Sequence, residues 1–257
     1  MTRILITNDD GIDSPGLWCL AGTARDAGLD VVVAAPHQEA SGSSASITIQ
    51  DHEGRIRIEE RDLAALPGVP AYAVVAPPAL ITLLATRGAF GEPPSLVLSG
   101  INRGANTGHA VLHSGTVGAA LTAAANGRPA MAVSLDVGLH PAAEPYWESA
   151  ARFVRELLPA LCRISRPTVL NLNAPDRPEE EIDGLRHATL AAFGVVQTKV
   201  EVGDGHVRMA LSDEEADREP GTDAAWLAGG YATITAINPV FEASDLDLDE
   251  LIGAVSA

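Results

Sequence analysis

Hydrophobic residues along this chain form two kinds of pattern. Some form short continuous runs, and in longer stretches they recur every three or four positions. Short runs are typical of strands buried on both faces, and the longer periodic stretches are typical of helices. We predict strands at 3–7, 31–35, 46–49, 55–59, 71–75, 95–98, 130–134 and 168–172, helices at 15–27, 78–87, 114–126 and 145–162 (broken or ended around Pro159), and loops at 36–45 and 99–113. This alternation predicts an α/β fold, a Rossmann-like, mostly parallel sheet with helices on both faces.

The pattern changes in the last part of the chain. Residues 185–211 have the pattern of hairpin strands with Gly203-Asp204-Gly205 as the turn, and alternation returns at 231–237 before an acidic tail at 244–251. This portion is expected to form a carboxyl-terminal β-rich hairpin extension without independent stability. The predicted organisation is therefore an α/β catalytic core at 1–184 and the extension at 185–257.

The most informative polar segment is Asn8-Asp9-Asp10-Gly11, which places two adjacent carboxylates directly after an apolar run. Ligands gather at the carboxyl ends of strands in an α/β sheet, and carboxylates clustered there with other oxygen donors suit a hard divalent cation. Asp10-Gly11 would also serve as the corner of a β-hairpin, with no metal. The following Ser14-Pro15, an N-cap and a proline at the first helical position, instead predicts strand, acidic loop and helix.

The charge of the chain narrows the class of partner. A formal net charge of -17 would repel the phosphates of a nucleic-acid duplex, so we expect a small-molecule partner. Lys199 is the only lysine, which removes P-loop and lysine Schiff-base chemistry from the amino-terminal half. Metal chemistry or chemistry without a cofactor remains.

Length and composition predict a protein with a substantial core, since 46% of its 257 residues are hydrophobic. No apolar stretch approaches the ~20 residues that span a bilayer, and the amino terminus lacks the features of a signal peptide. We therefore expect a cytoplasmic protein without a membrane partner. Cys19 and Cys162 lie beside apolar faces of predicted helices, which favours small core residues over a disulfide or zinc site.

Three further segments fall where such a sheet directs a ligand. Residues 36–46 are rich in hydroxyl and small side chains, and residues 99–108 combine three glycines with two asparagines, which permits close backbone approach. Ser114-Gly115-Thr116-Val117-Gly118 begins an alanine-rich helix whose free amides can receive an anion. A solvated loop, an irregular loop and an ordinary N-cap are the plain alternatives, so each segment alone is weak evidence.

Four blocks in order along the chain carry a family resemblance: 4–12 with Ser14-Pro15-Gly16; Ala35-Pro36 with Ser41-Gly42; Ser99-Gly100-Ile101-Asn102 with Gly104, Asn106 and Gly108; and Ser114-Gly115-Thr116-Val117. In this combination the chain resembles the SurE family, stationary-phase survival proteins that act as metal-dependent 5'/3'-nucleotidases. Softer similarities extend to 129–134, 170–173, Thr222-Asp223 and Gly230-Tyr231.

The resemblance implies one divalent cation per subunit, Mg²⁺ or Mn²⁺, bound by Asp9, Asp10, Ser41 and Asn102. The chemistry agrees, because two carboxylates, a hydroxyl and an amide oxygen form an all-oxygen shell. Such an ion can activate a bound water and neutralise charge on a phosphoryl group, which makes Asp9, Asp10 and Asn102 candidate catalytic residues. The candidate phosphate-binding residues are Ser43, Asn106, Ser114, Gly115 and Thr116.

The chain departs from the family pattern near the expected substrate. Many relatives carry Gly-Thr-Pro-x-Asp where this chain has Ala76-Pro77-Pro78-Ala79-Leu80, and a tyrosine where it has His113. His109 likewise stands where acidic residues are common. Imidazole titrates near neutral pH, so His109 and His113 are candidate proton donors to a leaving alkoxide, with a packing role as the open alternative.

The leading hypothesis is a metal-dependent phosphomonoesterase, similar to the 5'/3'-nucleotidases, that hydrolyses a nucleoside monophosphate or a related phosphorylated metabolite. A non-catalytic nucleotide- or phosphate-binding protein and an oligomeric scaffold are the alternatives. The resemblance also implies a homodimer or homotetramer in which the carboxyl-terminal extension reaches a neighbouring subunit.

Overall fold

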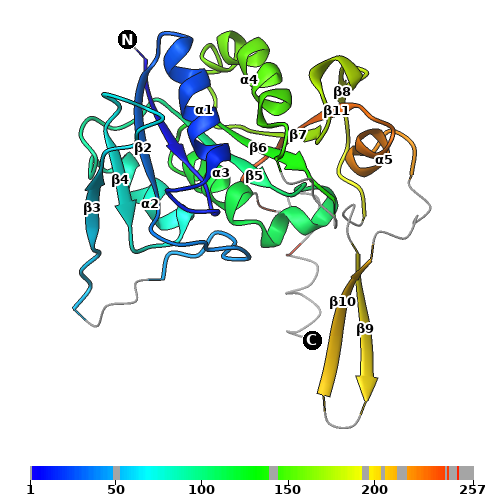
Figure 1. Cartoon of the computed structure of the whole chain (residues 1–257). Helices are drawn as coiled ribbons and strands as arrows, with labels where there is room; N and C mark the ends of the chain where they lie inside the picture. The colour runs from blue at the N-terminus through cyan, green and yellow to red at the C-terminus, as the bar shows by residue number, and fades with distance from the viewer. Residues whose placement is uncertain are drawn as a thin grey trace.

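Nine strands form one mixed sheet in the order β3-β4-β2-β1-β5-β6-β7-β11-β8, and β9 and β10 form a separate hairpin (Figure 1). The computed structural model describes residues 2–48, 53–138, 144–192, 197–203, 206–212, 219–240, 242 and 248. The strands are β1 (Arg3–Thr7), β2 (Asp30–Pro36), β3 (Ile58–Arg61), β4 (Ala71–Val74), β5 (Leu96–Arg103), β6 (Ala130–Asp136), β7 (Val169–Pro175), β8 (Leu185–His187), β9 (Gln197–Gly203), β10 (His206–Ser212) and β11 (Ala232–Ile237). From β4 to β7 all neighbouring strands are parallel, which confirms the predicted, mostly parallel sheet.

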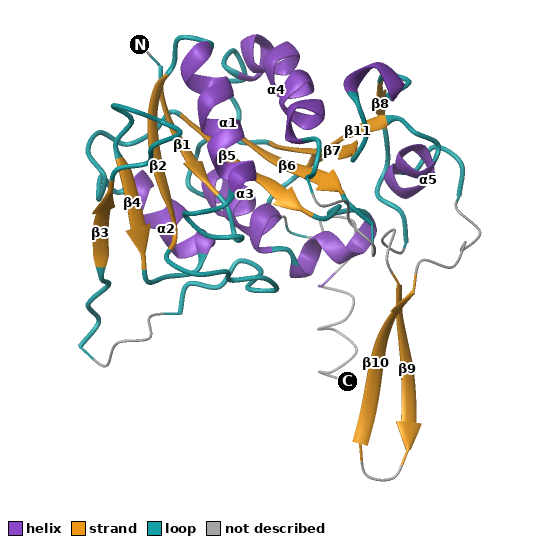
Figure 2. Ribbon diagram, viewed as in Figure 1, coloured by secondary structure: helices purple, strands orange, loops and turns teal. Residues whose placement is uncertain are grey.

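Helices cover both faces of the sheet, as predicted (Figure 2). They are α1 (Pro15–Asp26), α2 (Pro78–Thr86), α3 (Gly115–Ala125), α4 (Trp147–Leu161) and α5 (Asp223–Ala228), with two short 3₁₀ helices, η1 (Gly108–His113) and η2 (Glu179–Glu181). Successive side chains of a strand point to opposite faces. Ile4 and Ile6 of β1 therefore join one core cluster with α1 and α4, while Leu5 joins the other with α2 and α3. Burial on both faces explains the continuous apolar runs.

The order of the strands creates a switch point beside β1. After β1, the chain adds β2 and β4 on one side of it and then β5, β6 and β7 on the other. β1 and β5 are neighbours, paired from Ile4 with Leu96 to Thr7 with Ser99. Ligand-binding crevices of open α/β sheets lie at the carboxyl ends of strands at such a point. The Asp9-Asp10 loop and the end of β5 meet there.

Some predicted strand boundaries in the core are wrong. Residues 46–48 form no strand: Ile47 is 58% exposed and the Ser46 hydroxyl donates to Thr48 Oγ1 (3.1 Å). Alternating polar and β-branched residues resemble a strand, but without a neighbouring strand local hydrogen bonds replace the ladder. β3 begins at Ile58, later than predicted, and β5 continues to Arg103, into the predicted loop.

Strands from beyond residue 184 complete the main sheet. β11 pairs antiparallel with β7, and β8 pairs parallel with β11. Leu185–His187 therefore does not belong to the hairpin, contrary to the prediction. The hairpin itself is confirmed, because β9 and β10 pair antiparallel from Gln197 with Ser212 to Gly203 with His206. The centre of the predicted turn, 204–205, and the tail at 244–251 lie outside the described residues, apart from residue 248.

Two expectations about the helices also change. α4 continues through Pro159 to Leu161, since a proline this close to the helix end removes one late hydrogen bond only. Cys162 follows α4 as an exposed residue and Cys19 is partly buried, and both are free thiols. Within the described residues, no helix has the length and apolar character needed to cross a bilayer.

Candidate active site

Asp9 and Asp10 lie at the carboxyl end of β1, in a loop that is held by hydrogen bonds. The Asn8 side chain accepts from the Gly11 N–H (3.2 Å) and donates to the Gly11 carbonyl (3.0 Å). Gly11 adopts a φ of 100°, a left-handed conformation that favours glycine. The Ala40 N–H donates to the Asp9 carbonyl (2.7 Å). The two carboxylates are thereby fixed relative to the loop that follows β2.

The first turn of α3 lies directly against Asp9. This carboxylate is 5% exposed, and the Thr116 hydroxyl donates to its Oδ1 (2.5 Å). A Cβ added at Gly115 would lie 2.7 Å from Asp9 Oδ2 and 2.7 Å from Ser43 Oγ. Only a glycine at this position therefore lets the helix start approach the carboxylate so closely, where its amides favour a negative charge.

The protein alone disfavours the charged form of both carboxylates. Burial raises the pKa of Asp9, and the Thr116 hydrogen bond opposes this shift. Burial, together with the charges of Asp9 and Glu39, raises the pKa of Asp10 to about 7, although the Arg103 N–H donates to it (3.2 Å). A cation between the carboxylates would offset these effects, because an opposite charge favours the ionised form.

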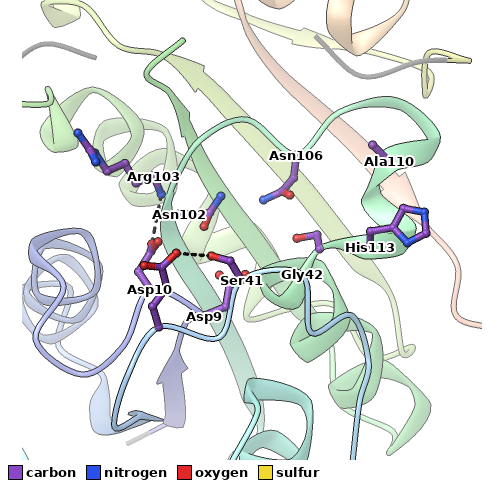
Figure 3. A pocket seen from close by; sticks show the side chains of 11 residues that line it. Asp9, Asp10, Ser41, Gly42, Asn102, Arg103, Asn106, Ala110 and His113 are labelled. Atoms are coloured by element: carbon purple, nitrogen blue, oxygen red, sulfur yellow. Dashed lines mark hydrogen bonds between the residues drawn. The ribbon is translucent and has the colours of Figure 1, made fainter. Parts of the chain in front are cut away.

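Both carboxylates line a hollow of about 370 Å³ at the switch point (Figure 3). Its other lining residues are Glu39, Ser41, Gly42, Asn102, Arg103, Asn106, Ala110, His113 and Ser114. The hollow thus brings together all four residues predicted to bind the metal, Asp9, Asp10, Ser41 and Asn102.

The orientation of the two neutral candidate ligands fits an oxygen-binding cation. The Ser41 hydroxyl donates to Glu39 Oε1 (2.7 Å), which leaves its oxygen lone pairs free to face the hollow. Asn102 Nδ2 donates to the Gly104 carbonyl (2.7 Å), and its amide oxygen lies on the side of the carboxylates (Figure 3). Among the described residues, no three His, Cys, Asp or Glu side chains form a cluster suited to a metal ion. A cation held here would use these neutral oxygens beside the carboxylates.

The predicted phosphate-binding residues take different places. Ser114 and Asn106 line the hollow, and Ser114 also caps α3 by accepting from the Val117 N–H (3.1 Å). The buried Ser43 hydroxyl has no hydrogen-bond partner among the described residues. Thr116 is fully buried and, like Gly115, is absent from the lining. The Thr116 hydroxyl donates to Asp9, because the helix start lies against that carboxylate, and its role toward a phosphate stays a prediction.

The two candidate histidines are also separated. His113 lines the hollow at the end away from Asp10 (Figure 3). His109 is exposed and does not line it, and its backbone N–H donates to the Ala191 carbonyl (3.0 Å). Of the two, His113 is the one that lines this hollow, and a catalytic role for either histidine stays a prediction.

Asn106 is held by polar side chains of β6 and β7. Its backbone N–H donates to Asn173 Oδ1 (2.8 Å), its carbonyl accepts from Asn171 Nδ2 (2.8 Å), and its side-chain Nδ2 donates to the Ser134 hydroxyl (2.9 Å). All three partners are fully buried. The sequence signal was present, since two asparagines at a spacing of two in a buried strand need partners on one face.

Asp223 fixes the same loop from the far end of the sequence. This fully buried carboxylate, the first residue of α5, accepts from the backbone N–H groups of Gly108 (2.9 Å), Ala191 (2.9 Å) and Ala224 (2.8 Å). It thereby connects the start of η1 to the carboxyl-terminal part of the chain. The similarity at Thr222-Asp223 pointed to this position but not to its role.

Comparisons with known proteins give one consistent result. Residues 4–195 match the family model described as Survival protein SurE. A 5'-nucleotidase SurE of Dehalococcoides mccartyi (strain ATCC BAA-2100 / JCM 16839 / KCTC 5957 / BAV1) is 36% identical over 265 residues, covering 98% of this chain and 97% of the relative. A 5'/3'-nucleotidase SurE of Escherichia coli O127:H6 is 34% identical over 242 residues, covering 92% and 90%. The crystal structure of the SurE protein from Aquifex aeolicus matches with a TM-score of 0.79 at 25% identity, over 99% of this chain and 100% of that chain.

Proposed function

This chain belongs to the SurE family, and we propose from that premise that it is a metal-dependent phosphomonoesterase that hydrolyses nucleoside monophosphates to nucleoside and phosphate. The observation that carries the proposal is the convergence of Asp9, Asp10, Ser41 and Asn102 on one hollow. A scaffold or a simple phosphate-binding protein has no physical need for two adjacent, mutually repelling carboxylates. An enzyme that holds a divalent cation has that need.

Asp9, Asp10, Ser41 and Asn102 are the residues that would hold one Mg²⁺ or Mn²⁺ ion per subunit. Their oxygens suit a hard cation. The raised pKa of Asp10 reflects its burial and the charges of Asp9 and Glu39, which Arg103 offsets only in part. When bound, the ion supplies Lewis-acid stabilisation of the phosphoryl group and activation of a water molecule.

Other residues of the hollow, together with Ser43 beside it, would orient the phosphate and the leaving group. Ser43 has an unpartnered hydroxyl, and the second hydrogen of Asn106 Nδ2 stays free to donate. Ser114, the N-cap of α3, lines the hollow. In the reaction, the water oxygen bonds to phosphorus while the bond from phosphorus to the leaving oxygen breaks. His113 is then the candidate donor of the proton that this leaving oxygen takes up.

Release of phosphate from 5'- and 3'-nucleoside monophosphates and from p-nitrophenyl phosphate, with Mg²⁺, with Mn²⁺ or with excess chelator, tests the proposal. We expect metal-dependent release that Asp9→Asn abolishes while the circular dichroism spectrum stays unchanged. Asp13→Asn is the matched control, because Asp13 is exposed, pairs with Arg61 (3.0 Å) and does not line the hollow. Undiminished activity in chelator, or full activity of Asp9→Asn, would refute the metal assignment.

A further inference from the structure

A second hollow, of about 730 Å³, adjoins the candidate active site. The two hollows share the lining residues Glu39, Ser41 and Gly42. The second one extends from these residues along the loop after β2 to the ends of β2 and β4 and to Ala76-Pro77. A substrate whose phosphate lies beside Asp9 and Asp10 can therefore place its leaving group in this second hollow.

Arg57 is the one arginine or lysine that lines the second hollow within the described part of the chain. Its backbone carbonyl accepts from the Val75 N–H (2.9 Å), which extends the antiparallel pairing of β3 with β4 beyond Ile58 and Val74. The sheet edge thus fixes the base of this side chain, while the side chain itself is exposed. Its position beside the hollow is a consequence of the fold.

The Arg57 guanidinium has no ion-pair partner among the described residues. The arginines on either side are paired, Arg55 with Glu53 and Arg61 with Asp13. Glu39, the carboxylate of the lining, instead accepts the Ser41 hydroxyl (2.7 Å). Arg57 therefore adds to the lining a positive charge that is not ion-paired with Glu39 or with another described carboxylate.

Other groups that line the second hollow can also donate to an anion. Ser46 and Thr48 line the hollow and place their hydroxyls 3.1 Å apart. An arginine fork beside hydroxyl groups matches the geometry of a phosphate or carboxylate. Ala76 and Pro77, which also line the hollow, add no charge.

We propose that the second hollow receives the leaving group of the substrate and that Arg57 pairs with a second anionic group on it. The preferred substrates are then phosphomonoesters that carry a further phosphate or a carboxylate. This inference rests on the phosphomonoesterase function proposed above and narrows its substrate class. If the leaving group carries no second anion, Arg57 stays hydrated and adds nothing to the affinity for the substrate.

Two substrate pairs test the inference, each pair differing mainly in the second anion. They are adenosine 5'-monophosphate against adenosine 3',5'-bisphosphate, and glycerol 3-phosphate against 3-phosphoglycerate. Charge-assisted hydrogen bonds lead us to expect a kcat/KM about tenfold higher for the doubly anionic member of at least one pair. The pair that shows the preference identifies a phosphate or a carboxylate as the second group.

Arg57→Gln should abolish this preference through a rise in KM, whereas Arg61→Gln, a neighbouring arginine on β3 outside the lining, should retain it. Equal kcat/KM within both pairs, or a preference that survives Arg57→Gln, overturns the inference. If no phosphomonoester is hydrolysed, the proposed function fails separately, and calorimetry with adenosine 3',5'-bisphosphate still decides. Binding about tenfold weaker in Arg57→Gln supports the second site, and equal affinity overturns it.

Discussion

The Asp9 carboxylate is buried, and the Thr116 hydroxyl is the side-chain donor that favours its charged form. Thr116→Val keeps the shape of the side chain and removes this bond, so a cation at Asp9 should be held less well. We expect a loss of about 10–100-fold in metal affinity or kcat/KM, as when a group behind a metal ligand is removed. Metal titrations of the initial rate measure it.

Thr122→Val is the matched control for this variant, since its hydroxyl donates to the Gly118 carbonyl (2.8 Å) in the same helix. It should leave metal affinity unchanged. Equal losses in the two variants would assign the effect to the helix rather than to Asp9.

Asp10 should make the stability of the metal-free protein depend on pH. Its pKa rises from 3.8 to about 7 on folding, so the folded state binds the proton more tightly than the unfolded state. The contribution of Asp10 to stability is therefore highest below its unfolded pKa and declines as the pH rises towards 7. Above that pH both states are ionised and the full penalty remains.

Asp10→Asn removes this penalty. In excess chelator at about pH 8 we expect the variant to be more stable by on the order of 2–4 kcal/mol, because one pKa unit corresponds to about 1.4 kcal/mol. The gain should vanish near pH 4. Thermal unfolding across this range measures the effect, and a variant less stable than the parent at the higher pH would contradict it.

His113, if it protonates the leaving oxygen, should matter most for poor leaving groups. His113→Phe should lower kcat for a nucleotide by about 100-fold or more and flatten the alkaline limb of its pH profile. p-Nitrophenyl phosphate, whose leaving phenolate needs no proton, should respond much less. His109→Phe, which changes a histidine outside the hollow, is the control. If the pH profiles of both variants coincide with that of the parent protein, His113 has a packing role and donates no proton.

At the scale of elements, the first turn of α3 packs closely against the loop after β1. A methyl group at Gly115 would lie 2.7 Å from both Asp9 Oδ2 and Ser43 Oγ, closer than side-chain contacts allow. Gly115→Ala should therefore displace the carboxylate and lower kcat/KM by more than about tenfold, the effect of misplacing catalytic groups.

Gly22→Ala is the control for this substitution. Gly22 lies in α1, where the nearest atom to an added Cβ is Leu66 Cδ2 at 3.8 Å. This variant should keep full activity and gain about 0.5–1 kcal/mol of stability, because alanine favours helix more than glycine does. Kinetics and thermal unfolding of both variants separate a local clash from a general effect on helices, and an active Gly115→Ala enzyme would show that Asp9 tolerates displacement.

The elements that the sequence predicts well are those whose burial leaves a continuous or periodic pattern. The central residues of β1 and β2 are apolar because helices cover both faces, and α1 begins at Pro15 as its N-cap sequence indicates. The pairing of β11 with β7 could not be predicted, because a short alternating segment does not indicate which strand it joins. The strand predicted at 46–49 was wrong over residues 46–48 for the same reason, since a strand forms only where another strand can pair with it.

In the candidate site, too, the sequence predicts some residues and not others. Asp9 comes shortly after β1 and Asn102 lies near the end of β5, so the apolar runs before them could place both at the carboxyl ends of neighbouring strands. The groups that hold the site come from distant segments: Asp223 lies 115 positions from Gly108, and Thr116 lies 107 positions from Asp9. Such pairs depend on how α3 and α5 pack, and no local pattern encodes that.

At the scale of the whole molecule, the carboxyl-terminal part contributes to the site as well as to the sheet. Asp223 holds the loop that leads to His113, and β11 and β8 extend the sheet beyond β7. The hairpin is different, because within the described residues β9 and β10 pair only with each other. Figure 1 shows it projecting from the body of the molecule.

A projecting two-stranded hairpin needs a partner. Such a unit is marginally stable alone, and both of its outer edges present unpaired backbone groups. The alternative, that the hairpin folds back on its own subunit, does not match its projection in Figure 1. We propose that a neighbouring subunit covers it and that the protein is a homodimer or homotetramer.

Light scattering coupled to size exclusion should therefore give a mass of two or four times the 26.6 kDa of one chain. Replacing residues 197–212 with a short Gly-Ser linker should reduce the mass to that of one chain, because the hairpin supplies the contact. The same linker inserted after Gly68, an exposed turn with open space around it, should leave the assembly intact. The parent protein eluting as a fully active single chain would reject assembly through the hairpin, and an unchanged oligomer after its removal would move the interface to another surface.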